Sequence, residues 1–219
     1  MVSCALIAAL RHAGLRAVGM KPIASGSQMT SQGLRNDDAL RLQAAGRVAE
    51  YNLVNPFAYE APIAPHIAAA QTHVPIELGP IVESFSQLAK ISDTVVVEGA
   101  GGFRVPLDIH GTTMAEIPKQ LGLDVVMVVA IRLGCLNHAL LTAEAIQSEG
   151  LRLIGWVANC VDENVPFSNE QIATLCTALN VPLMGRLPLF DLKQSLSPET
   201  IAGYLTIDYL VSDARKAEL

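Results

Sequence analysis

The chain has 219 residues, of which 51% are hydrophobic and 16% are charged, and its formal net charge is −6. This composition suits one domain with an apolar core and argues against a disordered chain. Lysine and arginine form no basic cluster, so we expect no nucleic-acid partner. Apolar runs such as residues 125–131 are too short to cross a membrane, and the first residues lack a basic leader. We therefore expect a single cytoplasmic domain over residues 1–219, with no membrane partner.

In chain order, short apolar runs alternate with helical patterns, which predicts an α/β fold built on a mainly parallel sheet. The runs are apolar on both faces, so helices should cover both faces of the sheet. Ligands bind beyond the carboxyl ends of the strands in such sheets. The predicted strands are residues 15–20, 94–98, 124–131, 153–161 and 181–187, and the predicted helices are residues 37–46, 80–93, 136–150 and 168–180.

Two local details complete this prediction. Ser168 is the expected N-cap of its helix, and Asn180 the expected end. Residues 51–80 contain five prolines and little periodicity, which predicts a loop with one short helix.

A lone carboxylate, Glu98, ends the apolar strand in TVVVEGAGG, residues 94–102. The glycines that follow permit positive φ angles and a close approach of the backbone to a ligand. P-loop nucleotidases use an acid in such a position to hold magnesium near phosphates. The alternative is a strand end with a solvated glutamate.

Lys21 also follows a predicted strand directly, and Pro22 restricts it to extended geometry. A lysine at that edge can neutralise an oxyanion or a phosphate, although an ordinary surface lysine fits the pattern equally well. The next residues, Ser25 to Ser27, offer small polar groups and N–H donors.

Asp37 and Asp38 open a predicted helix, where acids also favour the helix dipole or cap the first turn. If a second acid joins Glu98 on magnesium, this pair is the best source.

A further helix begins after the strand at residues 124–131, and its first N–H groups, from Gly134 to Asn137, form a candidate anion site. His138 lies inside that helix, where packing or capping explains it better than catalysis. Asn159 ends another strand, where its amide can recognise a base edge or cap a turn.

The four cysteines have no metal-binding spacing, and we expect reduced, mostly buried thiols.

Taken together, these stretches resemble the dethiobiotin synthetase family, whose ATP-dependent ligases close the ureido ring of dethiobiotin from 7,8-diaminononanoate and CO2 in biotin biosynthesis. The match extends over about residues 3–190, in the family's order. The stretches that carry it are KPIASGS, GLRNDDAL, APHI, VVVEGAGG, RLGCLNHALLT, GWVAN and LP at 187–188.

This resemblance implies ATP and Mg2+ as cofactors, a homodimer, and a role for each matched residue. Lys21 would be the catalytic lysine, and Asp38 and Glu98 would hold magnesium. The implied substrate-binding residues are Ser25 and, around the substrate carboxylate, Gly134, Cys135, Leu136 and Asn137. The implied ATP-binding residues are Asp38, Glu98, Gly99, Ala100, Gly101, Asn159, Cys160, Pro188, Leu189 and Phe190.

The sequence departs from the family in one respect, because its 219 residues contain no G-x-x-x-x-G-K-T phosphate loop. The resemblance therefore predicts a P-loop NTPase-like sheet whose first strand and phosphate loop are missing, with a gap between the neighbours of that strand. One explanation is a start at an internal methionine, so that the true protein is longer by roughly 20 residues, the length of a strand with its loop. The other is a catalytically silent, dimeric relative that binds a small carboxylate. On either explanation, we expect these 219 residues to bind ATP poorly.

Overall fold

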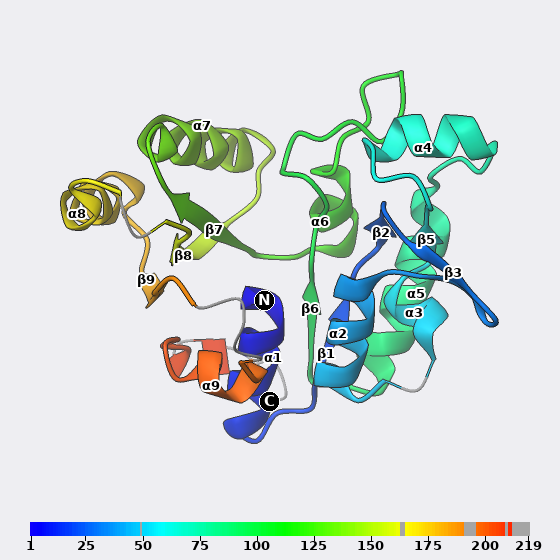
Figure 1. Cartoon of the computed structure of the whole chain (residues 1–219), viewed down its shortest axis with the longest axis horizontal. Coiled ribbons are helices and arrows are strands. Elements are labelled where there is room, and N and C mark those ends of the chain that lie inside the picture. The colour runs from blue at the N-terminus through cyan, green and yellow to red at the C-terminus, as the bar shows by residue number, and fades with distance from the viewer. Residues whose placement is uncertain (49, 163–164, 191–195, 209, 212–219) are drawn as a thin grey trace.

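The structure is a computed structural model that describes residues 1–48, 50–162, 165–190, 196–208 and 210–211 (Figure 1). The helices are α1 (Val2–His12), α2 (Asp37–Gly46), α3 (Tyr51–Val54), α4 (Pro65–Thr72), α5 (Leu78–Lys90), α6 (Glu116–Leu121), α7 (Cys135–Ser148), α8 (Ser168–Leu179) and α9 (Pro198–Ala202). The strands are β1 (Ala17–Met20), β2 (Ile23–Ala24), β3 (Gln28–Thr30), β4 (Gly33–Arg35), β5 (Phe57–Ala58), β6 (Thr94–Val97), β7 (Val125–Ile131), β8 (Leu153–Cys160) and β9 (Leu183–Leu187).

All five predicted strands are present, and they pair in parallel in two separate sheets. In the first sheet β1 pairs with β6, with Ala17 opposite Thr94. In the second, β8 lies between β7 and β9. The predicted parallel α/β fold is therefore confirmed. A short parallel pair, β2–β5, and an antiparallel hairpin, β3–β4, were not predicted.

Helices pack on each sheet because the strands carry apolar side chains. The first sheet contacts α1, α2 and α5, and the second contacts α7 and α8 (Figure 1). Gly19 of β1 permits the close packing of α1 and α2, since a Cβ there would lie 2.8 Å from Ile7 Cδ1 and 2.9 Å from Leu42 Cβ. In the second sheet Trp156 is fully buried at the centre of a separate core.

The two sheets do not pair with each other through β6 and β7 in the described part of the chain. One edge of β6 pairs with β1 and one edge of β7 pairs with β8, and their other edges meet a cleft rather than a strand. Val128, in the middle of β7, is consequently 47% exposed. The resemblance predicts a gap in the sheet, and this cleft interrupts the sheet in that manner.

Two local predictions were wrong. Residues 51–80 form two complete short helices, α3 and α4, the short strand β5 and the start of α5 rather than a loop with one helix. Pro65 explains the start of α4, because proline is favoured in the first turn of a helix and Pro65 is the first residue of α4. Ser168 is the first residue of α8 and not its N-cap, a position that Phe167 takes in left-handed conformation without a side-chain hydrogen bond.

Other local expectations agree with the structure. Asn180 ends α8 in left-handed conformation. All four cysteines are free thiols, but Cys160 is half-buried and Cys176 exposed, so only two are buried as expected. The short helix α9 is the last helix in the described part of the chain, and residues 212–219 lie outside the described residues. No helix in the described ranges is long and apolar enough to cross a membrane.

Candidate active site

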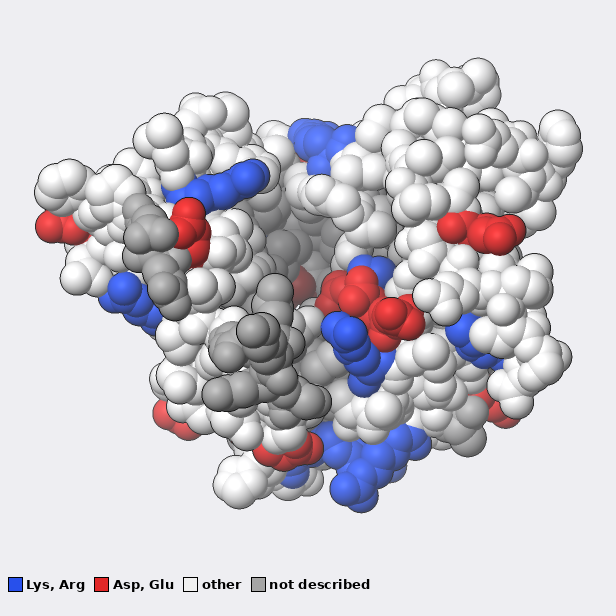
Figure 2. All heavy atoms as spheres, viewed as in Figure 1, with Lys and Arg blue, Asp and Glu red and all other residues white. Residues whose placement is uncertain are grey.

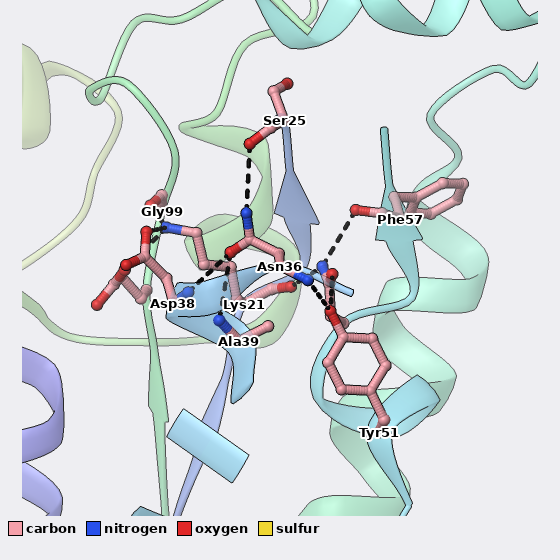
Figure 3. A network of polar contacts seen from close by, with 10 residues as sticks. Lys21, Ser25, Asn36, Asp38, Ala39, Tyr51, Phe57 and Gly99 are labelled. Carbon is pink, nitrogen blue, oxygen red and sulfur yellow. Dashed lines mark hydrogen bonds and ion pairs between the residues drawn. The ribbon is translucent and has the colours of Figure 1, made fainter. Parts of the chain in front are cut away.

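The predicted lysine and both predicted magnesium ligands meet at the carboxyl ends of β1 and β6. Lys21 Nζ donates a hydrogen bond to Glu98 Oε1 over 2.8 Å and another to the Gly99 carbonyl over 3.2 Å. Its distance to Asp38 Oδ2 is 3.6 Å. Parallel pairing of the two strands, with Met20 opposite Val97, places the residues that follow them side by side. Figure 3 shows Lys21, Asp38 and Gly99 converging.

Burial and the charge of Lys21 shift the pKa of Glu98 in opposite directions. The Lys21 side chain is 9% exposed and that of Glu98 is 23% exposed. Burial alone would raise the pKa of Glu98, but the charge and hydrogen bond of Lys21, helped by a hydrogen bond from Ser3, hold this pKa below its ordinary value. Glu98 is therefore a carboxylate at neutral pH, and Lys21 is no solvated surface lysine.

Asp38 is free to face Lys21 because another residue caps its helix. Asn36 is the N-cap of α2, and its side-chain oxygen accepts hydrogen bonds from the backbone N–H groups of Asp38 and Ala39. Capping therefore does not occupy the Asp38 carboxylate, which is half-exposed beside Lys21. On the face shown in Figure 2, acidic and basic side chains gather over α2.

The glycine run after Glu98 borders the cleft between the two sheets. This cleft has a volume of about 590 Å³, and the run contributes Gly99, Gly101 and Gly102 to its lining. Gly101 has a φ of 76°, a conformation that favours glycine. Val97 and the length of β7 line the same cleft. Backbone groups after Glu98 can thus approach a ligand in the cleft, as the sequence predicts.

The predicted anion site at the start of α7 opens into the same cleft. Gly134 is the N-cap residue with a φ of 89°, and Gly134 and Cys135 both line the cleft. Cys135 is buried, and its Sγ donates to Gln171 Oε1 over 3.0 Å. Leu136 is half-buried and Asn137 exposed in the first turn. The interpretation of His138 as a packed residue was wrong, since it is exposed at the cleft, and its capping role stays a prediction.

The residues predicted to surround adenine lie on the second sheet. Asn159 and Cys160 end β8, where both are half-buried, and residues 188–190 follow β9. The Phe190 ring packs edge-on against Tyr204 with ring centroids 5.6 Å apart. These positions share the carboxyl edge of one sheet, and their assignment to adenine stays a prediction.

Ser25 lies directly after β2, and Figure 3 shows it facing the Asn36 side chain. Its carbonyl accepts a hydrogen bond from Asn36 Nδ2 over 3.3 Å. Its hydroxyl and that of Ser27 are buried and have no hydrogen-bond partner in the described part of the structure. Buried hydroxyls normally find a partner, so these two are suited to a polar ligand.

Asp38 and Glu98 suit magnesium better than a metal whose ligands must all come from protein side chains. No group of three His, Cys, Asp or Glu side chains gathers as a metal cluster among the described residues. Magnesium is commonly held by one or two carboxylates together with water and substrate phosphates. Asp38 and Glu98 both contact one ammonium group, so their carboxylates carry one negative charge more than Lys21 neutralises.

Comparisons with known proteins agree with this geometry. A family described as an AAA domain matches residues 1–195. The MinC:MinD cell division protein complex of Aquifex aeolicus matches 99% of this chain and 89% of the compared chain, with a TM-score of 0.50 at 14% identity, which supports the fold alone. Parallel strands, a carboxylate after β6 and a lysine after β1 thus define an α/β protein of the P-loop NTPase class.

Closer relatives identify the family. The chain is 45% identical to the ATP-dependent dethiobiotin synthetase BioD of Xylella fastidiosa over 205 residues, which are 93% of this chain and 89% of the relative. It is 49% identical over 189 residues to the protein of that name from Xanthomonas axonopodis pv. citri, covering 86% and 84% of the two chains. The BioD of Cellvibrio japonicus is 47% identical, with 86% and 82% covered. The chain belongs to the dethiobiotin synthetase family.

Sequence patterns missed several residues of this site. Ser3 stabilises the Glu98 carboxylate, and the buried Asn55 donates to the Lys21 carbonyl. The buried Tyr51 links Asn55 to Asn36. Ser3 gives no signal because a serine in the first turn of a helix has a common local explanation. The asparagines precede a helix and a proline, where capping and turn roles are also ordinary.

Proposed function

We propose that this protein is an ATP- and magnesium-dependent ligase that makes dethiobiotin from 7,8-diaminononanoate and CO2. The observation that supports this function most is the convergence of Lys21 with Asp38 and Glu98, at 3.6 and 2.8 Å, at one edge of the first sheet. The similar proteins from Xylella fastidiosa and Xanthomonas axonopodis pv. citri are both named ATP-dependent dethiobiotin synthetase, which supports this proposal.

The reaction joins two amines through one carbon. The carbon of CO2 bonds one amine nitrogen to give a carbamate, and a carbamate oxygen then takes the terminal phosphoryl group of ATP as ADP leaves. The second amine attacks the carbonyl carbon, and phosphate departs with that oxygen. Each step develops negative charge on oxygen, which a preorganised cation stabilises.

Lys21 supplies this cation. Its ammonium group is held by Glu98 and by the Gly99 carbonyl, so it is oriented before a substrate arrives. Bound magnesium would neutralise the phosphate oxygens, held by Asp38 and Glu98. The backbone from Gly99 to Gly101, on the wall of the cleft, would lie next to the carbamate and phosphate groups.

The substrate would be held at two points. Ser25 has an unpartnered hydroxyl that suits an amine or a carbamate oxygen. The first turn of α7, from Gly134 to Asn137, presents N–H groups that suit the carboxylate of diaminononanoate, apart from the Cys135 N–H, which donates to the Arg132 carbonyl over 3.0 Å. Asn159, Cys160 and residues 188–190 would bound the adenine pocket. We also propose that the protein is a homodimer and that it acts in the cytoplasm.

The alternative function is a silent protein that binds a small carboxylate. It is favoured by the lack of a G-x-x-x-x-G-K-T sequence within the 219 residues, and opposed by the retention of Lys21, Asp38 and Glu98 in contact.

Phosphate release with diaminononanoate, bicarbonate and MgATP separates the two functions. MgATP is supplied at several times about 1 mM, the top of ordinary KM values, so that weak binding of ATP does not hide the reaction. The ligase produces phosphate and dethiobiotin in equal amounts, and only when diaminononanoate is present. Binding of diaminononanoate without any dethiobiotin would support the silent protein instead.

A further inference from the structure

A buried hydrogen-bond network lies beneath Lys21 and continues to the start of α2 (Figure 3). The Lys21 carbonyl accepts from Asn55 Nδ2 over 2.7 Å, and Asn55 Oδ1 accepts from the Tyr51 hydroxyl over 2.9 Å. The Tyr51 oxygen in turn accepts from the Asn36 backbone N–H over 2.8 Å. Four residues from three segments of the chain are thus linked in series.

The network has one consistent direction. The Asn36 N–H can only donate, so the Tyr51 hydroxyl accepts there and gives its own proton to Asn55 Oδ1. This bond fixes the orientation of the Asn55 amide. Its oxygen faces Tyr51, and its nitrogen donates to the carbonyls of Lys21 and Phe57. Reversal of one bond would leave two donors or two acceptors facing each other, which is costly in a buried site.

The network joins three residues of the candidate site. At one end it holds the backbone of Lys21, whose N–H also donates to the Val54 carbonyl over 2.7 Å. At the other end Asn36 receives the Asp38 N–H and donates to the Ser25 carbonyl. The predicted catalytic lysine, metal ligand and substrate-binding serine are thereby held through one tyrosine hydroxyl.

Tyr51 is suited to this role by its surroundings. It is 7% exposed, and burial raises the pKa of its hydroxyl, outweighing the Asn36 hydrogen bond and the Arg35 charge. The hydroxyl therefore keeps the proton that Asn55 requires. The Arg35 guanidinium lies 4.2 Å from the centre of the Tyr51 ring, so a cation also fixes the plane of the ring.

We propose that Tyr51 is a positioning residue for the active site: its hydroxyl sets the placement of Lys21 relative to Asp38 and Ser25. It does not touch substrate and acts through the Asn36 and Asn55 side chains and backbones. The inference rests on the proposed function for the catalytic role of Lys21, while the positioning itself is a property of the chain alone.

The test replaces one buried hydroxyl inside the network and one outside it. Tyr51→Phe removes the link between Asn36 and Asn55. Tyr59→Phe is the matched control, because Tyr59 is 2% exposed and its hydroxyl donates to the Val74 carbonyl over 2.9 Å. Both variants should unfold at a lower urea concentration than the original chain, since Tyr51→Phe loses two hydrogen bonds and Tyr59→Phe loses one.

The readout is the rate at which acetic anhydride acetylates Lys21, measured by mass spectrometry against exposed Lys90 in the same sample. We expect acetylation of Lys21 to be several-fold faster in Tyr51→Phe and unchanged in Tyr59→Phe. Equal Lys21 rates in the original chain and Tyr51→Phe would overturn the proposal and leave Tyr51 with a structural role only. If Tyr51→Phe does not fold, Asn55→Ala tests the same link through the same rate.

Kinetics extend the test to the reaction. Misplacement of a catalytic group by about 1 Å can cost about 100-fold in rate, so kcat for dethiobiotin should fall by about 10- to 100-fold in Tyr51→Phe and stay near normal in Tyr59→Phe. If the original chain forms no dethiobiotin, the proposed function fails, and the acetylation rates still decide the role of Tyr51.

Discussion

Lys21 donates a hydrogen bond to Glu98 over 2.8 Å although 77 positions separate the two residues in the chain. Parallel pairing of β1 and β6 brings them together, because each follows the last paired residue of its strand. The contact keeps a cation and an anion, both largely shielded from water, at the sheet edge where ligands bind. Removal of either partner should therefore affect both chemistry and stability.

Replacement of the lysine tests its chemical role. Lys21→Met keeps most of the apolar side chain but removes the cation that we propose stabilises developing negative charge. Loss of one such group typically lowers kcat by about 100- to 1,000-fold. Steady-state dethiobiotin formation measures this effect. Lys90→Met, at the exposed end of α5, removes the same charge and should leave kcat unchanged; a similar loss in both variants would argue against a specific role.

Acid should weaken the fold through Glu98. Its pKa is lower in the folded protein than its ordinary value of 4.5, because Lys21 outweighs the effect of burial. The ion pair therefore contributes stability that is fully present above that ordinary value and is lost as the pH falls through the lowered folded value. Urea unfolding of the original chain and Glu98→Gln at several pH values from about 6 down to about 3 measures this contribution.

The difference between the two chains separates the effect of Glu98 from that of the other described carboxylates with lowered pKa values, Asp93, Asp108, Glu149 and Glu199. The stability difference should shrink toward acid. A difference that stays constant with pH would show that the ion pair does not titrate as its geometry requires.

Magnesium binding should depend on Asp38 of α2 and not on the neighbouring Asp37. Asp38 lies 3.6 Å from Lys21 Nζ, whereas Asp37, in the same helix turn, forms no ion pair with Lys21 in the described part of the structure. Asp38→Asn should raise the magnesium concentration needed for half-maximal activity by at least about tenfold, as perturbed metal sites commonly do. Asp37→Asn carries the same charge change and should have little effect. Equal effects would indicate a general electrostatic contribution rather than a ligand.

The glycine run should resist substitution for a conformational reason. An alanine at position 101 would hold a φ of 76° and place its Cβ 2.9 Å from Val105 Cγ2. Left-handed conformation costs about 1–2 kcal/mol for a residue with a Cβ, before any clash. Gly101→Ala should lower the free energy of unfolding by at least that amount in urea titrations. Gly79→Ala in α5, where a Cβ meets nothing within 4 Å, should be neutral or stabilising.

The strands and the principal site residues could be predicted because their signals are local. Buried parallel strands appear as short apolar runs, and a charged residue directly after such a run must emerge at the carboxyl edge of the sheet. Lys21 and Glu98 both satisfy this description. The prediction did not require knowledge of which strands are neighbours.

The remaining features depend on contacts between distant segments. Tyr51 begins the four-residue helix α3, which is too short to be stable from its own sequence and depends on packing around it. Its partners Asn36 and Asn55 lie 15 and 4 positions away, and a tyrosine at this spacing has no distinctive pattern. The N-cap of α8 was also unpredictable, since Phe167 takes a left-handed conformation that phenylalanine rarely adopts.

Incorporation of carbon-13 tests the central claim most directly. The original chain is incubated with diaminononanoate, MgATP and [13C]bicarbonate, and the product is examined by mass spectrometry. The ligase predicts dethiobiotin that carries one heavy carbon, formed with one phosphate per product and abolished in Lys21→Met. Absence of labelled dethiobiotin from the folded chain at saturating MgATP, or undiminished product from Lys21→Met, would contradict this mechanism.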